Sequence, residues 1–328
     1  MIDKIKEDLF YKGEFSFSYS SLNRLLFSPK LFYRDYILKE RELKMEKHLI
    51  EGRLVHLLLL EPDRFDEEFK VVPTRIPSDS LRKVLYDISH HTDLTELSIV
   101  DDKIILQSLK NVGLYQSLKD ESKRIAKVRT IECEDYYGFK TNSKGLEVID
   151  NDMLTRATER VDIIKSNKDV MALLMEQGTD WDLDHIQVYN EKKLNCDLNN
   201  YKFGLKGIID KYIVDDESKT ITIVDIKTTA KPLENFAETV DFYNYWLQAA
   251  IYSLLVIKNV DENQQDYKII FKFVAIDKYD QVYAFPVSES TLLRWMNELN
   301  RALKLANYHY SERKYDLPYE FANGNVIL

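Results

Sequence analysis

The segment GIIDKYIVDDESKTITIVDIK, which starts at Gly207, constrains this chain most, because it reads as two strands that bring two aspartates to one point. The first strand is predicted over residues 203–214 and contains Asp210. A polar DDESK turn follows, and the second strand, TITIVDIK, ends with Asp225, an isoleucine and Lys227. Side chains two residues apart lie on one face of a strand, so Asp225 and Lys227 should project together. The segment predicts an antiparallel hairpin with two carboxylates and one ammonium group.

These residue types suit a site where Mg²⁺ meets a phosphodiester. Mg²⁺ is usually held by one or two carboxylates together with water and substrate phosphate. Asp210, Asp225 and the backbone carbonyl of Ile226 could supply oxygen ligands. Lys227 could hold the attacking water or help to deprotonate it. The hairpin therefore predicts Mg²⁺-dependent cleavage of phosphodiester bonds, in which Mn²⁺ can substitute for Mg²⁺.

Two flanking helices are predicted to complete the site. Upstream, MEKHLIEGRLVHLLLLEPDRF has the apolar spacing of a helix, and it carries His56 four residues after Gly52. Downstream, residues 236–257 are predicted to form one long helix on which Gln248 and Tyr252 share a face. His56 is the candidate that completes or orients the metal site.

Other carboxylates lie near the hairpin. Asp184 and Glu191 are on or beside the strand predicted at 185–196, and each is a candidate ligand for a second metal ion. Asp215 and Asp216 are poorer candidates for the main site, because they fall in the turn between the two strands.

The order of these motifs resembles that of a nuclease family. A histidine helix, an aspartate, Asp-x-Lys and Gln-x-x-x-Tyr follow one another as in the RecB-like branch of the PD-(D/E)xK nuclease superfamily, with Gly207-Ile-Ile-Asp210 in place of the proline-aspartate motif. The segment GRLVHLLLLEPDRFDEEF is similar to one in RecE-type exonucleases, the exodeoxyribonuclease VIII-like proteins of phages and prophages. The N-terminal FSFSYSSLNRLLFSPKLFYRDYI is similar to the opening of RecB-like nucleases.

The resemblance implies a fold, a reaction and partners. The fold would be restriction-endonuclease-like, of the α/β (α+β) class, with a central mixed β-sheet flanked by helices. The protein would degrade one strand of linear double-stranded DNA from 5′ to 3′ in recombination or repair, beside a single-strand annealing protein and as a homo-oligomeric ring. Gln248 and Tyr252 would hold the active-site lysine or contact DNA. Two alternatives remain, namely a RecB-like single-strand or helicase-associated nuclease, and a non-catalytic DNA-binding or assembly protein on the same fold.

The charge distribution bears on DNA binding. The chain of 328 residues has a net charge of −9, although lysine and arginine contacts with phosphates normally supply most non-specific affinity for DNA. Basic residues gather between Arg24 and Lys47 among aromatic side chains, which predicts a local DNA groove in an acidic exterior. Solvated helix faces are the alternative interpretation. The DNA-binding candidates are Ser20, Arg24, Lys30 and Arg34.

Cysteine content argues against two other classes. Cys133 and Cys196 are too few and too far apart for the four-thiolate iron–sulfur cluster of some RecB-like nucleases, and Ser28 stands where those proteins have a cysteine before the N-terminal proline. Two cysteines also argue against a disulfide-stabilised secreted protein, and no apolar run is long enough to span a bilayer. We expect no iron–sulfur cluster, no membrane partner, and a cytoplasmic location in a bacterial or phage-infected cell.

The chain is predicted to form a single nuclease domain over residues 1–328. Its expected parts are a helical N-terminal part at 1–70 with the histidine motif, a helical insertion at 71–150 with helices near 80–90 and 102–127, the nuclease core at 151–316, and an irregular tail at 317–328.

Overall fold

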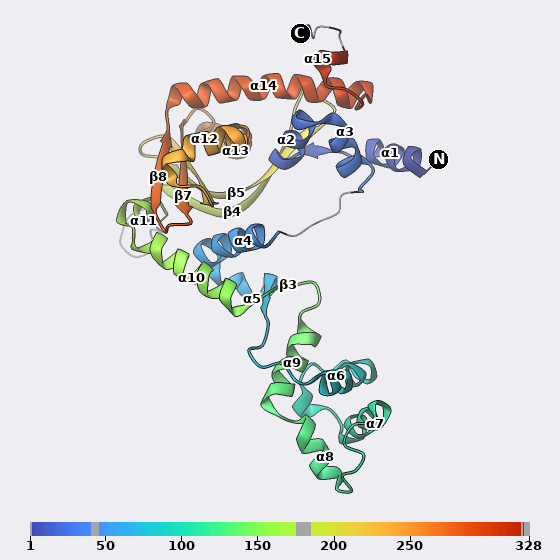
Figure 1. Ribbon diagram of the computed structural model, residues 1–328. Helices are drawn as coiled ribbons and strands as arrows, with labels where there is room; N and C mark the ends of the chain where they lie inside the picture. The colour runs from blue at the N-terminus through green and yellow to red at the C-terminus, as the bar shows by residue number, and fades with distance from the viewer. Residues whose placement is uncertain (1, 41–45, 175–184, 323, 325–328) are drawn as a thin grey trace. The chain divides into compact units, whose positions relative to one another are not determined.

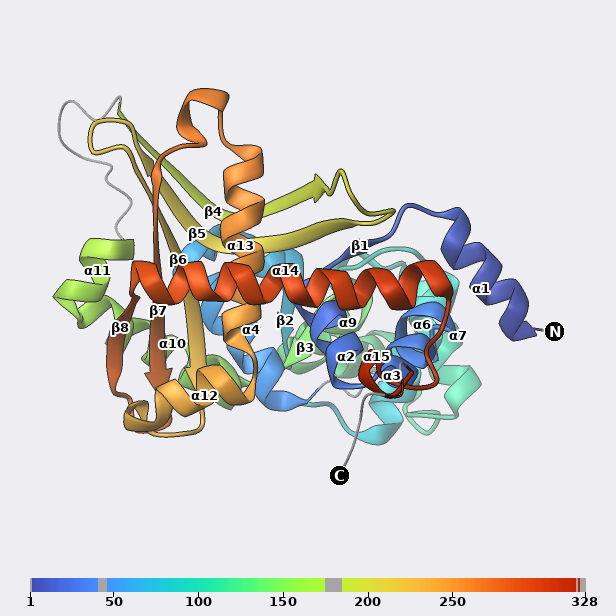
Figure 2. The same cartoon turned by 90° about the horizontal axis from the view of Figure 1, so that it is seen from above.

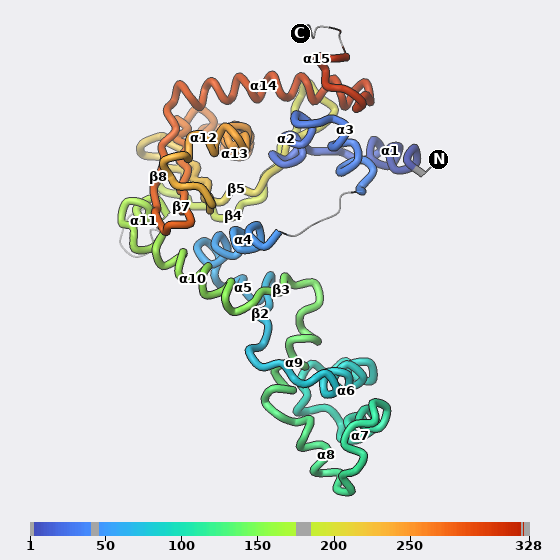
Figure 3. Tube along the Cα trace, viewed as in Figure 1, coloured from blue at the N-terminus to red at the C-terminus, as the bar shows by residue number. Residues whose placement is uncertain are grey.

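The computed structural model describes residues 2–40, 46–174, 185–322 and 324 (Figures 1 and 3). The chain divides into two compact units. The sheet unit consists of Met1–Glu61 and Arg160–Leu328, and the helical unit consists of Pro62–Glu159. The helical unit overlaps the predicted insertion at 71–150. The expectation of a single nuclease domain stays a prediction.

The sheet unit is built on a mixed β-sheet, in which the described residues form six strands. They are β1 (Ser16–Phe17), β4 (Ile186–Asp197), β5 (Gly204–Asp215), β6 (Thr220–Thr229), β7 (Lys268–Asp277) and β8 (Val282–Val287). Strands β4 and β5 are antiparallel, as are β5 and β6 and also β7 and β8, whereas β1 pairs in parallel with β5 and β6 pairs in parallel with β7. The predicted mixed sheet and its three consecutive antiparallel strands are confirmed.

Strand β5 has two different neighbours along one edge. Strand β4 pairs with its other edge from Gly204 to Asp215. On the first edge, β1 pairs with Gly204 and Leu205, whereas β6 pairs with residues 211–215. Between these two pairings, residues 206–210 have no strand partner on that edge within the described part of the chain. The sheet therefore forks beside Asp210, and side chains from other elements can enter there.

Helices cover both faces of this sheet (Figures 1 and 2). Helix α13 (Tyr245–Asn259) packs on β4 and β5 from one side, and α4 (Lys47–Leu60) lies on the other side and contacts β6. Burial of α13 is driven by Leu247, Ile251 and Leu255, which are fully buried at intervals of four residues. The other helices of the unit are α1 (Ile2–Lys12), α2 (Tyr19–Phe27), α3 (Pro29–Phe32), α11 (Lys168–Leu174), α12 (Phe236–Phe242), α14 (Glu289–Glu312) and α15 (Tyr319–Ala322), and α10 (Asn151–Ser166) enters it from the helical unit.

The crowding at Gly204 gives a prediction about stability. A Cβ atom at this position would lie 2.6 Å from the backbone oxygen of Cys196 and 3.0 Å from Ser16 Oγ. Because a backbone atom cannot move aside easily, Gly204→Ala should destabilise the protein by about 1–3 kcal/mol. Gly138→Ala is the control, since its nearest atom, Thr95 O, is 3.8 Å away and alanine favours a helix interior by about 0.5–1 kcal/mol. Thermal unfolding of both variants measures this, and an unchanged Gly204→Ala midpoint would contradict the packing described.

The prediction of one long helix over residues 236–257 is wrong, because this segment forms two helices, α12 and α13. Asn244 between them adopts a left-handed backbone with φ of 56°. Asparagine enters this region more readily than most residues, because its short side chain can hydrogen-bond locally. Its side chain does so here, since Asn244 Oδ1 accepts a 2.9 Å hydrogen bond from Trp246 Nε1.

The helical unit has its own hydrophobic core, which includes Val84, Leu109 and Tyr137. The prediction of a helix near 80–90 is confirmed. The prediction of one helix over 102–127 is wrong, because the observed helix that begins at Asp102 ends at Gly113, whose backbone is left-handed. The elements of this unit are α5 (Phe65–Glu68), β2 (Phe69–Val71), α6 (Asp79–His91), α7 (Asp102–Val112), α8 (Glu121–Val128), α9 (Ile131–Asn142) and β3 (Glu147–Ile149). Among the described residues of the whole chain, no helix is both long enough and apolar enough to cross a membrane.

Candidate active site

Three side chains from different elements converge at the fork of the sheet. His56 comes from α4, Glu191 from β4 and Asp210 from β5, and one ligand atom of each lies within 4.8 Å of the other two. His56 Nδ1 is 3.5 Å from Asp210 Oδ2 and 3.9 Å from Glu191 Oε1. An imidazole and two carboxylates at these distances can share one divalent cation. We call these three residues the carboxylate–histidine cluster.

Gly52 allows the histidine helix to reach the cluster. A Cβ atom at Gly52 would lie 3.2 Å from Thr228 Oγ1, so the absence of a side chain lets α4 approach β6 closely. His56 follows one helical turn later on the same face. The glycine–histidine spacing in the sequence is therefore explained by packing of the helix on the strand that carries Asp225 and Lys227.

Asp210 is fixed in place by the neighbouring strand. Its Oδ2 accepts a 2.7 Å hydrogen bond from the backbone N–H of Ile226. The backbone of Ile226 therefore lies beside Asp210, and a ligand role for its carbonyl stays a prediction.

Asp225 and Lys227 form a buried ion pair beside the cluster. The Asp225 side chain is 0% exposed and that of Lys227 is 12% exposed. Apart from the Lys227 ammonium, neither oxygen of Asp225 meets a hydrogen-bond donor among the described residues. Buried carboxylate oxygens are normally supplied with several donors or cations. The two Asp225 oxygens are therefore suitable ligands for a divalent cation such as Mg²⁺.

Glu191 joins the cluster through an unusual backbone. Its neighbours Asn190 and Lys192 pair with Lys211 and Ile209, so Glu191 stands opposite Asp210 in the β4–β5 register. Its φ of 43° is in the left-handed region, which costs a non-glycine residue on the order of 1–3 kcal/mol. Such strain is common at functional sites. Glu191 is placed to bind the same ion as Asp210, whereas its role at a second metal stays a prediction.

Comparisons with known proteins can be set beside this geometry. A model of the PD-(D/E)XK nuclease superfamily matches residues 16–316. The chain belongs to the PD-(D/E)XK nuclease superfamily. A crystal structure of a protein from Eubacterium rectale, provisionally called an exonuclease, is 13% identical with a TM-score of 0.49, and the match covers 100% of this chain and 91% of that one. That likeness is too distant to add to the assignment, and no curated protein matches the chain.

Burial and charge set the protonation states in this superfamily site. Burial, together with the Lys227 ammonium, lowers the pKa of His56 to about 4, so its imidazole is neutral near pH 7. Burial raises the pKa of Asp210, and it raises that of Asp225 to about 6 despite the attraction of Lys227. Burial alone would lower the pKa of Lys227, but the Asp225 and Asp210 carboxylates outweigh it and the pKa is raised. At neutral pH the site offers the neutral imidazole of His56, the ionised carboxylate of Asp225 and the charged ammonium of Lys227.

These pKa values predict how metal binding depends on pH. Below about pH 6 a proton occupies Asp225 and competes with the metal, so affinity should fall by up to about tenfold per pH unit. Above about pH 6 Asp225 is ionised, and affinity should level off. Titration of Mn²⁺ between about pH 7.5 and pH 5, followed by electron paramagnetic resonance, measures this effect. Equal affinity across that range would show that Asp225 is not a ligand.

Gln248 and Tyr252 lie beneath the site, on α13. Gln248 Nε2 donates a 2.8 Å hydrogen bond to the Tyr252 hydroxyl, and both side chains are buried. Burial and the Asp210 and Asp225 carboxylates raise the pKa of Tyr252, so its phenol stays neutral. Gly207 leaves room for its ring, since a Cβ atom there would lie 3.1 Å from Tyr252 Cε1. Both roles expected of this pair, holding Lys227 and contacting DNA, stay predictions.

The DNA-binding candidates differ in their surroundings. Arg24 and Arg34 both donate to the buried carboxylate of Asp35, with Nε to oxygen distances of 2.8 Å. Their guanidinium groups therefore balance the charge of a buried aspartate within the protein. Lys30 and Ser20 are exposed. A DNA-binding role for these residues stays a prediction.

A cleft of about 600 Å³ opens beside the fork. It is bordered by Gly207 and Tyr252 near the site, and by Ser20, Lys193 and Lys206 farther away. Two lysines and several hydroxyl groups along this cleft suit the phosphates of a DNA strand.

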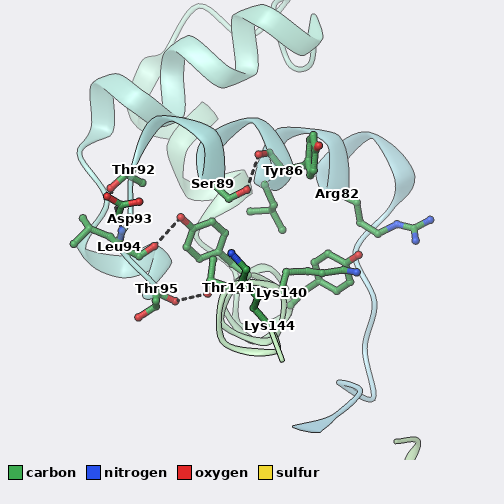
Figure 4. Close-up of a pocket in the computed structure, with 13 residues that line it drawn as sticks. Arg82, Tyr86, Ser89, Thr92, Asp93, Leu94, Thr95, Lys140, Thr141 and Lys144 are labelled. Carbon is green, nitrogen blue, oxygen red and sulfur yellow. Dashed lines mark hydrogen bonds between the residues drawn. The ribbon is translucent and has the colours of Figure 1, made fainter. Parts of the chain in front are cut away.

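Another cavity, of about 470 Å³, lies within the helical unit between α6 and α9 (Figure 4). Tyr86 and Lys140 line it, and the Tyr137 hydroxyl donates to Leu94 O at 2.9 Å. Its lining contains one carboxylate, Asp93, and no imidazole or predicted site residue. The cluster that could hold a metal ion, formed by His56, Glu191 and Asp210, lies in the sheet unit.

The remaining predictions concern residues outside this cluster. Asp184, the other candidate for a second metal, lies outside the described residues. Cys133 belongs to the helical unit and Cys196 to the sheet unit. The expectation that no iron–sulfur cluster is present stays a prediction.

Proposed function

We propose that this protein is a Mg²⁺-dependent deoxyribonuclease that acts as an exonuclease on one strand of linear double-stranded DNA. One observation carries the proposal, namely the carboxylate–histidine cluster beside the Asp225–Lys227 ion pair. Membership of the nuclease superfamily supports it. The finer part, degradation from 5′ to 3′, is supported by the resemblance of the His56 segment to RecE-type exonucleases.

In this proposal one set of residues binds Mg²⁺ and Lys227 orients the attacking water. Asp210, Asp225, the Ile226 carbonyl, His56 and Glu191 would hold Mg²⁺, and Mn²⁺ could replace it. When bound, such an ion polarises a phosphodiester and favours hydroxide over water. The hydrogen bond from the Ile226 N–H holds Asp210 in position before metal arrives.

Lys227 has a defined part in the proposed reaction. Its raised pKa keeps the ammonium charged at neutral pH, which makes it a poor base. It would orient the attacking water and stabilise the negative charge that develops on the phosphate oxygens. Asp225 holds the ammonium through the ion pair.

The proposed biological setting follows from the same resemblance. An exonuclease that leaves a 3′ single strand would work beside a single-strand annealing protein in recombination or repair, in a bacterial or phage-infected cell. We propose a homo-oligomeric ring, which would keep the enzyme on one DNA molecule through successive cleavages.

Digestion of duplex DNA labelled separately at each 5′ and 3′ end tests this function, with a circular duplex alongside. The proposal predicts early release of 5′ label, delayed loss of 3′ label and intact circles. Loss of circular DNA would indicate an endonuclease. Cleavage of single strands alone would favour the RecB-like single-strand alternative, and intact DNA in both Mg²⁺ and Mn²⁺ would favour a non-catalytic protein.

A further inference from the structure

The chain turns a corner between α12 and α13 (Figure 2). Two aromatic side chains at this corner, Phe242 and Tyr243, are exposed. We propose that Phe242 and Tyr243 form a stacking platform for the bases of the DNA strand whose phosphate lies at Lys227. The inference rests on the proposed function, and it adds the substrate feature that this surface recognises.

The corner is held by specific contacts. Asn244 has φ of 56° and ψ of 41°, a conformation that persists in a non-glycine residue when its surroundings enforce it. Asn244 Nδ2 donates a 2.8 Å hydrogen bond to Asn23 Oδ1, and Trp246 Nε1 donates to Asn244 Oδ1. The Tyr19 hydroxyl donates to the backbone oxygen of Tyr243. These bonds fix where the aromatic residues on either side of Asn244 point.

The aromatic rings form a continuous row that begins at the proposed catalytic lysine. Lys227 Nζ lies 4.8 Å from the centre of the Tyr245 ring. Tyr245 and Tyr243 are stacked, with ring centres 5.5 Å apart and planes inclined by 22°. Tyr243 meets Phe242 edge to face at 4.9 Å, and Lys231 Nζ lies 5.0 Å from the Phe242 ring. The row therefore leads from Lys227 outward to a second lysine.

The outer end of this row is open to solvent. Phe242 is 71% exposed and Tyr243 is 45% exposed, although both are large apolar residues held in fixed positions. Flat aromatic surfaces beside lysines complement a single strand, whose bases stack on the rings and whose phosphates meet the cations. Each base stacked on an aromatic side chain contributes about 1–3 kcal/mol, with little dependence on sequence. An exonuclease that must accept any sequence can use such a platform.

Binding of a single-stranded oligonucleotide that contains 2-aminopurine tests the platform. The assay is done in EDTA, so that it does not depend on cleavage. Stacking on the rings should quench the 2-aminopurine fluorescence of the bound strand. The double variant Phe242→Ala/Tyr243→Ala should bind at least about fivefold more weakly and lose the quenching, because one stacked base is worth about 1 kcal/mol or more.

Two further variants control for folding and for general loss of aromatic surface. Tyr243→Trp keeps a stacking surface and should retain binding and quenching. Phe321→Ala removes another exposed phenylalanine, on α15, and should bind like the wild type. Thermal unfolding shows whether each variant is folded.

The outcomes separate the platform from the proposed function. Wild-type affinity and quenching in the double variant, or no binding of the strand by the wild type, would overturn the platform. Light scattering that shows loss of oligomers in the double variant, with unchanged DNA binding, would also overturn the platform. In that case Phe242 and Tyr243 would form a contact between two copies of the chain. If quenching depends on Phe242 and Tyr243 but the wild type cleaves no DNA in Mg²⁺ or Mn²⁺, the platform stands and the proposed function fails.

Discussion

Asp210→Ala should reduce DNA cleavage by at least about 10³-fold, the largest effect of a single substitution that we expect. The variant loses one carboxylate of the carboxylate–histidine cluster, and it leaves the Ile226 N–H without its 2.7 Å acceptor. The remaining proposed ligands, His56, Glu191, Asp225 and the Ile226 carbonyl, would bind Mg²⁺ more weakly, because one of three carboxylates is lost. Initial rates on linear duplex DNA at saturating Mg²⁺ measure the loss.

Asp216→Ala is the matched control for this variant. Asp216 lies six residues farther along, but its Oδ1 accepts hydrogen bonds from Gln264 Nε2 and the Tyr267 hydroxyl, outside the site. Its loss should leave the cleavage rate within about twofold of the wild type once folding is confirmed, because these partners lie outside the carboxylate–histidine cluster and the Asp225–Lys227 pair. Normal cleavage by Asp210→Ala would remove the basis of the proposed site.

Lys227→Met should lower the cleavage rate by about 10²–10³-fold and also destabilise the metal-free protein. Asp225 would lose the only cation that the described residues place beside it, and breaking a buried ion pair costs about 3–5 kcal/mol. Because a divalent ion supplies positive charge to Asp225, Mg²⁺ should raise the melting temperature of the variant more than that of the wild type. Metal should restore stability without restoring cleavage.

Lys268→Met is the control for removal of a lysine. Lys268 pairs with Glu289 at 3.0 Å, and both side chains are largely exposed. Exposed pairs contribute about 0–1 kcal/mol, so this change should affect stability little and cleavage not at all. If Lys227→Met cleaved DNA normally while remaining folded, its proposed role in charge stabilisation would be wrong.

The central hairpin could be predicted because its signals are local. Alternating apolar residues on both sides of a polar turn define β5 and β6, and the two-residue period places Asp225 and Lys227 on one face. The histidine helix follows in the same way from its apolar spacing. The order of the motifs then indicated that Asp210 and His56 meet, which the structure shows at 3.5 Å.

The corner at Asn244 could not be found from periodicity. Residues 236–257 contain no glycine or proline, so a continuous helix was the natural prediction. The backbone is turned by bonds to Asn23, which is more than two hundred residues away in sequence. Periodicity therefore does not indicate that Phe242, the last residue of α12, and Tyr243, which follows it, form an exposed pair. The asparagine itself was the only local signal.

Pairing between charges was the other feature that sequence did not show. Sequence predicts Arg24 and Arg34 as DNA-binding candidates but does not show that both pair with the buried carboxylate of Asp35. Similarly, sequence spacing does not show that Glu191 lies with His56 and Asp210, where its left-handed backbone and its register opposite Asp210 bring it. Both findings depend on contacts between elements, which composition and spacing do not define.

Binding of Mn²⁺ followed by electron paramagnetic resonance tests the central claim most directly, namely that the cluster around Asp210 holds a divalent cation. Wild-type protein, Asp210→Asn, Glu191→Gln and the control Asp216→Asn would be titrated in parallel near neutral pH. We predict a binding site that Asp210→Asn removes, Glu191→Gln weakens and Asp216→Asn leaves intact. Wild-type Mn²⁺ affinity in folded Asp210→Asn protein would contradict this account of the active site.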